Sequence, residues 1–248
     1  MPEGTTSAGD QFVQSLARGL SVIRAFDHDH REMTLSEVAE RVDLSRATTR
    51  RFLSTLVDLG YVRTDGRLFA LTPQVLQLGA AYLSGLGLPR VARPHLERLS
   101  AQIGQSTSAA VLDGADIVFV ARVAARRIIS VDITVGSRFP AGATSMGRVL
   151  LAGLPEAELS LRLPDSDALS AELESVRRQG WAAVDQELEP GLLSIAVPVR
   201  DGDARTVAAL GVSASTASSS LAELIDTCLP RLVETARLVG DDLALTGS

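Results

Sequence analysis

The sequence predicts an N-terminal all-α winged helix-turn-helix domain and a C-terminal α+β domain with an antiparallel sheet, joined by a linker helix. Three observations favour this class: helical periodicity in the first 60 residues, a turn signal between two β-prone runs directly after it, and alternating β-type runs beyond residue 105. A chain of 248 residues is long enough for two modest domains. The expected boundaries are a disordered tail over residues 1–10, the winged helix over 11–72, the linker helix over 73–88 and the second domain over 89–248.

The composition is that of an ordinary globular protein, with 46% hydrophobic and 22% charged residues. The single cysteine, Cys228, argues against a disulfide framework and a cysteine-based zinc site, so we expect no metal, no cofactor and a reducing cytoplasm. The N-terminus lacks the basic and apolar segments of a signal peptide. The uncharged stretch over 68–89 is interrupted by proline and glycine, so we expect no membrane span.

Three helices are expected before the wing. Leu16, Leu20, Ile23 and Phe26 lie at helical spacing and predict a helix over 15–26. A capping box then marks the start of the second helix, and a serine can cap the third, which a glycine ends. The residues with these capping roles are Thr34 with Glu37, Ser45, and Gly60. On the third helix we expect the apolar side chains to face the core, namely Phe52, Leu53, Leu56 and Leu59.

The start of the third helix is the candidate DNA-reading surface. The net charge is −6, but residues 44–71 carry five arginines against Asp58 and Asp65. Arginine can bind guanine, and threonine can contact a thymine methyl group or a phosphate. The turn Asp65-Gly66 predicts a hairpin, whose tip would carry a basic residue. The expected DNA-binding residues are Ser45, Arg46, Thr48, Thr49, Arg50, Arg51 and Arg67.

Each of these signals also has a plainer interpretation. An arginine-rich helix is usually a solvated surface, and helix-turn-helix units also occur as protein-interaction modules. The order of the elements, three helices followed by a hairpin with a basic tip, favours DNA binding. Between Pro73 and Ser84 an uncharged stripe at helical spacing (Val75, Leu78, Gly79 and Tyr82) predicts packing on a second subunit, as in dimers that read two half-sites.

The second domain begins with an expected helix over 90–104. Strands are then expected over 106–112, 116–123 and 128–135, helices over 147–154 and 168–179, strands over 181–185, 194–201 and 206–215, and a last helix over 221–243. Strands in hairpins with helices at both ends are typical of an α+β domain.

Four segments together resemble the isocitrate-lyase-regulator (IclR) family of bacterial transcription factors. They read SLARGLSVIRAF, LSEVAERVDLSRATTRRFLSTLVDLGYV, GSRFPAGATSMGRVLLAGL and RRQGWAAVDQELEPGLLSIAVPVRD, and the resemblance runs from Gln11 to Leu245. Within the family the chain looks most like the subgroup that controls aromatic-acid breakdown through protocatechuate and β-ketoadipate. The resemblance implies a GAF-like effector domain, a dimer or dimer of dimers, operator DNA that is palindromic, and a small carboxylic acid as effector. RNA polymerase is a further candidate partner.

The resemblance also implies where the effector binds. The implied site comprises the segment Ala143, Thr144, Ser145, Met146 and Gly147, together with Asp185, Glu187, Ser194, Gly211 and Ser213. Elementary chemistry agrees, because N–H groups at a helix start attract carboxylates and hydroxyls bind ligand oxygens. Met146 and Leu192 could form an apolar wall. Two departures bear on the polarity of the site: Arg148 stands where many relatives have lysine, and Ser194 and Gly211 where some have cysteine or a second serine. Alternatively, the Thr-Ser pair simply caps a helix.

An enzyme is the rival class, and the sequence argues against it. The histidines are His28, His30 and His95, none of them in a catalytic motif, and His95 is expected to face solvent. We therefore expect no catalytic residues. A sensor that does not bind DNA, and a regulator that responds to a 2-oxo acid or a sugar acid, stay open as alternatives.

Overall fold

The computed structural model describes residues 12–27, 29–79, 87–125, 133–162 and 167–246. Contacts divide the chain into two compact units, Met1–Ala81 and Tyr82–Ser248, and each unit is described by itself. No helix in these described ranges is long and apolar enough to cross a membrane.

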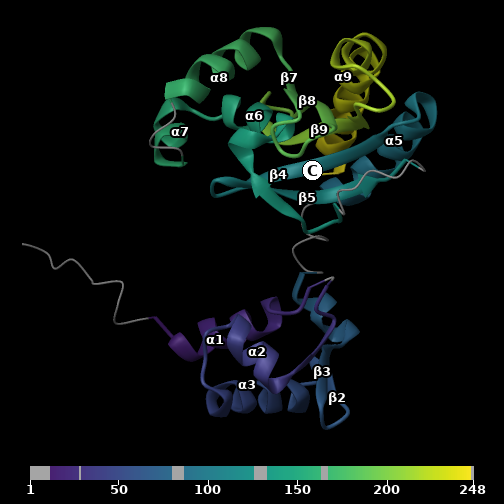
Figure 1. Ribbon diagram of the computed structural model, residues 1–248. Helices are drawn as coiled ribbons and strands as arrows, with labels where there is room; N and C mark the ends of the chain where they lie inside the picture. Colours follow the sequence, from purple (N-terminus) through teal and green to yellow (C-terminus); the bar gives the residue numbers. More distant parts are fainter. Residues whose placement is uncertain (1–11, 28, 80–86, 126–132, 163–166, 247–248) are drawn as a thin grey trace, which may run out of the picture. The chain divides into compact units, whose positions relative to one another are not determined.

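Ahead of residue 73, the described residues of the first unit form three helices and a small sheet (Figure 1). The helices are α1 (Gln14–Arg24), α2 (Leu35–Arg41) and α3 (Arg46–Asp58), and the antiparallel strands β1 (Glu32–Thr34), β2 (Val62–Thr64) and β3 (Leu68–Leu71) are ordered β1-β3-β2. The predicted caps are confirmed: Thr34 and Glu37 form a complete capping box, and Ser45 caps α3. The sequence did not predict β1, which completes the wing sheet by pairing with β3.

The core of this unit is buried around Val22, Phe26, Leu53 and Leu56. Leu59 was expected to face this core but is 55% exposed, and Leu16 (63%) and Leu20 (48%) of the spacing that predicted α1 are exposed as well. The buried stripe of α1 runs through Val22 rather than Leu20, and α3 ends at Asp58, before Leu59. The prediction for Leu59 was wrong because helical spacing alone does not say which side chains meet a neighbour.

The predicted linker helix over 73–88 is described only in part. Pro73–Val75 forms a 3₁₀ turn capped by Thr72, and residues 76–79 are helical. Residues 80–86, including Tyr82 of the expected apolar stripe, lie outside the described residues. The next described helix, α5, starts at Leu88.

The second unit is built on one antiparallel sheet of order β6-β5-β4-β9-β8-β7. Its strands are β4 (Ser106–Asp113), β5 (Asp116–Val123), β6 (Arg138–Pro140), β7 (Ala182–Asp185), β8 (Leu192–Arg200) and β9 (Thr206–Ser215). The helices α5 (Leu88–Ile103) and α9 (Leu221–Thr246) pack on one face, and α6 (Ser145–Ala152), α7 (Glu156–Arg162) and α8 (Asp167–Gln179) belong to the other side (Figure 1). Of the predicted strand over 128–135, residues 128–132 lie outside the described residues and residues 133–135 are not a strand.

Side chains on the sheet alternate between two cores. Leu210 and Val212 of β9 face α5 and α9, whereas Ala209 faces α6. A β-bulge interrupts this alternation in β5, where Val120 has no partner between the pairs Phe119↔Ala110 and Ala121↔Ala109. As a result, the side chains of β5 after the bulge point to the opposite faces of the sheet from those that simple alternation would give.

His95 on α5 does not face solvent as expected. It is 8% exposed, and its Nε2 lies 2.8 Å from Asp242 Oδ2 on α9. Arg98 donates to its Nδ1 at 2.8 Å. His95 thus joins α5 to α9 and lies away from the candidate effector residues.

Candidate DNA-binding surface and effector cavity

The first turns of α3 present positive charge. Arg46, Arg50 and Arg51 are exposed, so their guanidinium groups can approach a phosphate or a base edge. Ser45 Oγ accepts the backbone N–H of Thr48 at 3.2 Å and lies 2.9 Å from the Thr48 hydroxyl. Ser45 and Thr48 therefore fix the end of the helix that carries these arginines.

Thr49 is the one predicted DNA-binding residue that the structure removes from this surface. Its side chain is fully buried, at 0% exposed, in the interior of the first unit. Its hydroxyl has no hydrogen-bond partner. The prediction of a DNA contact was wrong, because the face of α3 that meets the core passes through this position.

Replacing Thr49 with valine is expected to raise the free energy of unfolding of the first unit by about 1 kcal/mol. A buried hydroxyl without a partner keeps its desolvation cost, and valine has nearly the same shape without that cost. Urea unfolding measures the change, and DNA affinity should stay unchanged. Thr49→Ser is the control, since it keeps the hydroxyl and loses a methyl group, and it should destabilise. A less stable Thr49→Val would mean that the hydroxyl has a partner after all.

The wing is fixed by the side chain of its turn residue. Asp65 Oδ1 accepts the backbone N–H groups of Leu68 at 2.7 Å and of Arg67 at 2.8 Å, and these bonds hold the pKa of Asp65 below its usual value. Gly66 has φ +95°, a conformation that suits glycine. Arg67 is exposed beside this turn. Local hydrogen bonding thus holds a basic residue at the wing tip.

In the second unit a small cavity lies between the start of α6 and the sheet face below it. Its volume is 40 Å³, enough for about one to three waters. Eight of the eleven predicted effector residues line it, namely Ala143, Thr144, Ser145, Met146, Leu192, Ser194, Gly211 and Ser213. The sequence reasoning missed Ser108, Phe119, Arg122, Ile133, Leu188 and Val212, which also line it. The structure therefore brings together segments from α6, four strands and the loop before β8.

Two of the hydroxyls at the cavity have different roles. Thr144 Oγ1 accepts the backbone N–H of Gly147 at 3.0 Å, so this residue acts as the helix N-cap. Ser145 Oγ donates to Ser194 Oγ at 3.0 Å across the cavity wall, joining α6 to β8. The capping interpretation thus fits Thr144, whereas Ser145 and Ser194 form a polar pair that a ligand oxygen can reach.

Three predicted effector residues do not line the cavity. A Cβ on Gly147 would lie 2.1 Å from the carbonyl oxygen of Ala141, so only glycine lets the backbone of Ala141 pack this closely against α6. Glu187 is exposed and accepts a hydrogen bond from Arg148 Nη2 at 2.5 Å. Asp185 is exposed and accepts a hydrogen bond from the Gln186 side chain at 3.0 Å. Their geometry indicates structural roles around the cavity.

Arg148 supports the same loop from the other side. It is 9% exposed, and its Nε donates to the carbonyl oxygen of Gly142 at 3.0 Å. Its guanidinium therefore bridges the 3₁₀ turn at Ala141–Ala143 and the carboxylate of Glu187. Arg148, which stands where many relatives have lysine, does not line the cavity itself. It instead holds in place the turn that forms part of the cavity wall.

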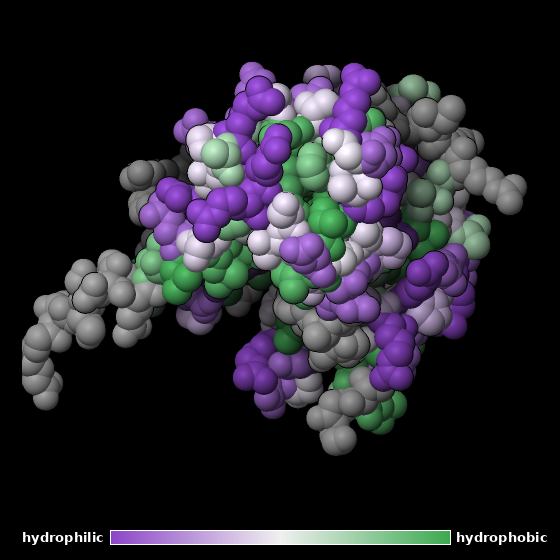
Figure 2. Space-filling model, turned by 90° about the horizontal axis from the view of Figure 1, so that it is seen from below, coloured by the Kyte–Doolittle hydropathy of each residue, from purple (hydrophilic) through white to green (hydrophobic). Residues whose placement is uncertain are grey.

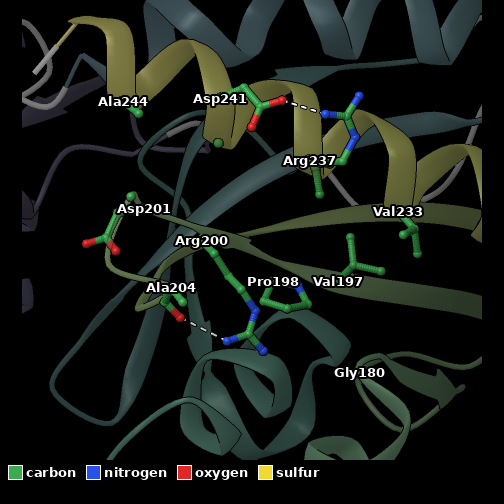
Figure 3. Close-up of a pocket in the computed structure, with 13 residues that line it drawn as sticks. Gly180, Val197, Pro198, Arg200, Asp201, Ala204, Val233, Arg237, Asp241 and Ala244 are labelled. Carbon is green, nitrogen blue, oxygen red and sulfur yellow. Dashed lines mark hydrogen bonds and ion pairs between the residues drawn. The ribbon is translucent and has the colours of Figure 1, made fainter.

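A larger hollow of 460 Å³ lies between β8 and α9 (Figure 3). Its charged groups bond within the protein: Arg237 pairs with Asp241 at 2.6 Å, and Arg200 donates to the carbonyl oxygen of Ala204 at 2.9 Å. None of the predicted effector residues lines it. The smaller cavity is the better candidate, because hydroxyls and a helix start converge there on an apolar wall.

Comparisons with known proteins agree with this architecture. The profile of the IclR helix-turn-helix domain matches residues 15–66, and that of the bacterial transcriptional regulator IclR C-terminal domain matches residues 80–240. The Pca regulon regulatory protein of Pseudomonas putida is 44% identical over 240 residues, covering 91% of this chain and 82% of that protein.

Two solved structures extend the comparison. A transcriptional regulator from Rhodococcus sp. RHA1 is 52% identical with a TM-score of 0.84, covering 95% of this chain and 100% of that one. An IclR homolog from Microbacterium hydrocarbonoxydans, complexed with 4-hydroxybenzoate, is 27% identical with a TM-score of 0.79, covering 92% and 98%. The chain belongs to the IclR family of bacterial transcriptional regulators.

Proposed function

We propose that this protein regulates genes of aromatic-acid catabolism, and that a small carboxylic acid bound at the α6 cavity changes its affinity for operator DNA. The observation that carries the proposal is the cavity itself, where Ser145 and Ser194 meet the apolar side chains of Met146 and Leu192. The name of the Pseudomonas putida relative and the 4-hydroxybenzoate in the Microbacterium structure support an aromatic acid as the effector class. The protein acts on DNA in the cytoplasm and needs no catalytic residue for this role.

The active form is a homodimer, or a pair of dimers, on a palindromic operator. Four large apolar side chains are exposed at the start of the first unit: Phe12 (67%), Val13 (59%), Leu16 (63%) and Leu20 (48%). Figure 2 shows hydrophobic side chains gathered where α1 begins. Such a stripe is typical of a surface that packs on a second subunit, and paired recognition helices read two half-sites.

Effector binding requires the cavity to open. A volume of 40 Å³ is far below the roughly 300 Å³ of a small ligand site. Met146 packs against Gly211: a Cβ added to Gly211 would lie 2.9 Å from the Cγ of Met146. The methionine side chain is flexible, so it can move more easily than the other wall residues. Movement of Met146 and the start of α6 thus couples the ligand to the rest of the domain. A coupling of about 1–3 kcal/mol changes DNA affinity about five- to 150-fold.

A thermal-shift and DNA-binding experiment tests the proposal. The purified protein is screened with 4-hydroxybenzoate, protocatechuate, β-ketoadipate, glyoxylate and a sugar acid, because a ligand that binds the folded state raises Tm. The affinity for the promoter DNA beside its gene is then measured with and without the acid. We expect an aromatic or dicarboxylic acid to raise Tm and to change DNA affinity.

The same experiment includes cavity variants. Ser145→Ala and Ser194→Ala should weaken binding of that acid, whereas Ser160→Ala on α7, which removes a hydroxyl bonded to the backbone of Glu156, should not. A response to glyoxylate or the sugar acid alone would contradict the aromatic assignment. Unchanged DNA affinity at saturating acid would contradict the coupling.

A further inference from the structure

Arg122 stands out among the described residues that line the α6 cavity, because it is the only one with a charged side chain. It is half-buried on β5, opposite Ser108 on β4. Its Nη1 lies 3.5 Å from Ser108 Oγ. A guanidinium group therefore borders a cavity whose other described walls are neutral.

The β-bulge in β5 is what brings Arg122 to this cavity. Phe119 lines the cavity, so simple alternation would send residue 122 to the α5–α9 side of the sheet. Because Val120 is unpaired, Val120 and Ala121 both face that side, and Arg122 returns to the α6 side. Bulges beside functional sites commonly re-aim a side chain in this way.

The cavity also has polarity along its length. The strand order places Arg122 on β5, Ser108 on β4, Ser213 on β9 and Ser194 on β8, so a cation lies at one end of a row of hydroxyls. The hydroxyl pair of Ser145 and Ser194 marks the other end. Phe119, Met146 and Leu192 supply apolar walls, where Phe119 is 4% exposed. This pattern matches a ligand with a carboxylate at one end, a flat apolar body and a hydrogen-bonding group at the opposite end.

We propose that Arg122 binds the carboxylate of the effector and makes the cavity selective for acids over their neutral analogues. The guanidinium offers parallel N–H donors that fit a carboxylate, and the half-buried position strengthens the pair relative to one in water. The Ser145–Ser194 pair then binds the opposite end of the ligand. This inference rests on the proposed function and names the residue that determines its ligand class.

The test compares acids with their neutral amides by isothermal titration calorimetry. 4-Hydroxybenzoate and 4-hydroxybenzamide, protocatechuate and its amide, and β-ketoadipate and its diamide are titrated into wild type, Arg122→Gln and Arg122→Lys. Arg122→Gln should weaken binding of the acid about 10- to 100-fold, as expected for loss of a charged hydrogen-bonded pair, and change amide binding less than about threefold. Arg122→Lys keeps the positive charge but loses the two parallel N–H donors of the guanidinium group, and should weaken acid binding by an intermediate factor.

Arg162→Gln is the matched control, since Arg162 pairs with Glu158 on α7 and does not line the cavity. Tm of each variant shows whether it folds. Equal losses for acid and amide in both Arg122 variants would overturn the inference, because they indicate a structural role alone. Wild type and Arg122→Gln binding the acid equally would also overturn it while leaving the proposed function intact. A wild type that binds none of the acids would refute the proposed effector class, and this inference with it.

Discussion

Arg46→Ala combined with Arg50→Ala is expected to weaken binding to promoter DNA about 30-fold or more. Both side chains are exposed on the first turns of α3, and each arginine contact to a base or a phosphate contributes about 1–3 kcal/mol. Fluorescence anisotropy with a labelled duplex, at several salt concentrations, measures the loss. Phosphate contacts would lower the salt dependence by about one unit each and weaken all sequences alike, whereas base contacts would reduce discrimination between sequences.

The control for this variant removes the same charge elsewhere. Arg93 and Arg178 are exposed arginines of the second unit, at 72% and 71% for their side chains; Arg93 pairs with Glu97, and Arg178 contacts Glu174 and Ser175. Alanine at both positions should leave DNA affinity within about twofold, since both arginines belong to the unit that carries none of the candidate DNA-binding residues. An Arg46→Ala/Arg50→Ala protein that is folded, binds the effector and keeps its DNA affinity would contradict the assignment of α3 as the recognition helix.

Features set by a few neighbouring residues could be predicted from the sequence. The capping box of Thr34 and Glu37 spans four positions, and the turn at Asp65-Gly66 depends on one side chain and one glycine conformation. Both partners of each of these hydrogen bonds lie within a few residues of one another, so the bonds do not depend on distant parts of the chain. The positions of the candidate arginines at the start of α3 followed from the same local cap at Ser45.

Features that depend on packing were harder to predict. Thr49 was assigned to DNA together with Thr48, but one step along a helix turns the side chain by about 100°, and Thr49 is buried. Leu59 was assigned to the core, but α3 ends before it and the residue is 55% exposed. The hydrophobic pattern identified the helices correctly, but it did not identify the face that each helix buries.

The effector cavity shows the same division. The residues Ala143 to Gly147 were predicted together as one segment, and all of them except Gly147 line the cavity. Ser108 and Arg122 were missed because they reach it through strand pairing across β4, β5 and β9 and through the bulge at Val120, which no local pattern signals. Glu187 was assigned to the ligand, but its partner is Arg148, which is 39 residues away along the chain.

Gly147→Ala is expected to destabilise the second unit by about 3 kcal/mol or more and to abolish effector binding at ordinary temperatures. A Cβ at this position would lie 2.1 Å from the carbonyl oxygen and 2.4 Å from the Cα of Ala141, and backbone atoms cannot move aside as a side chain can. Alanine would otherwise favour the helix by about 1 kcal/mol, so any loss of stability comes from this contact. Urea unfolding and calorimetry with the effector measure the two effects.

Gly202→Ala is the matched control, because no atom lies within 4 Å of its Cβ, and it should change stability by less than about 0.5 kcal/mol. Ala141→Gly should not rescue Gly147→Ala, since the contact is with backbone atoms that every residue has. Stability equal to wild type in Gly147→Ala would mean that α6 does not pack against the Ala141–Ala143 turn. If the variant instead loses both stability and ligand binding, Gly147 serves the effector site by letting the turn that carries Ala143 lie directly against α6, so its role is to shape the cavity wall and not to contact the ligand.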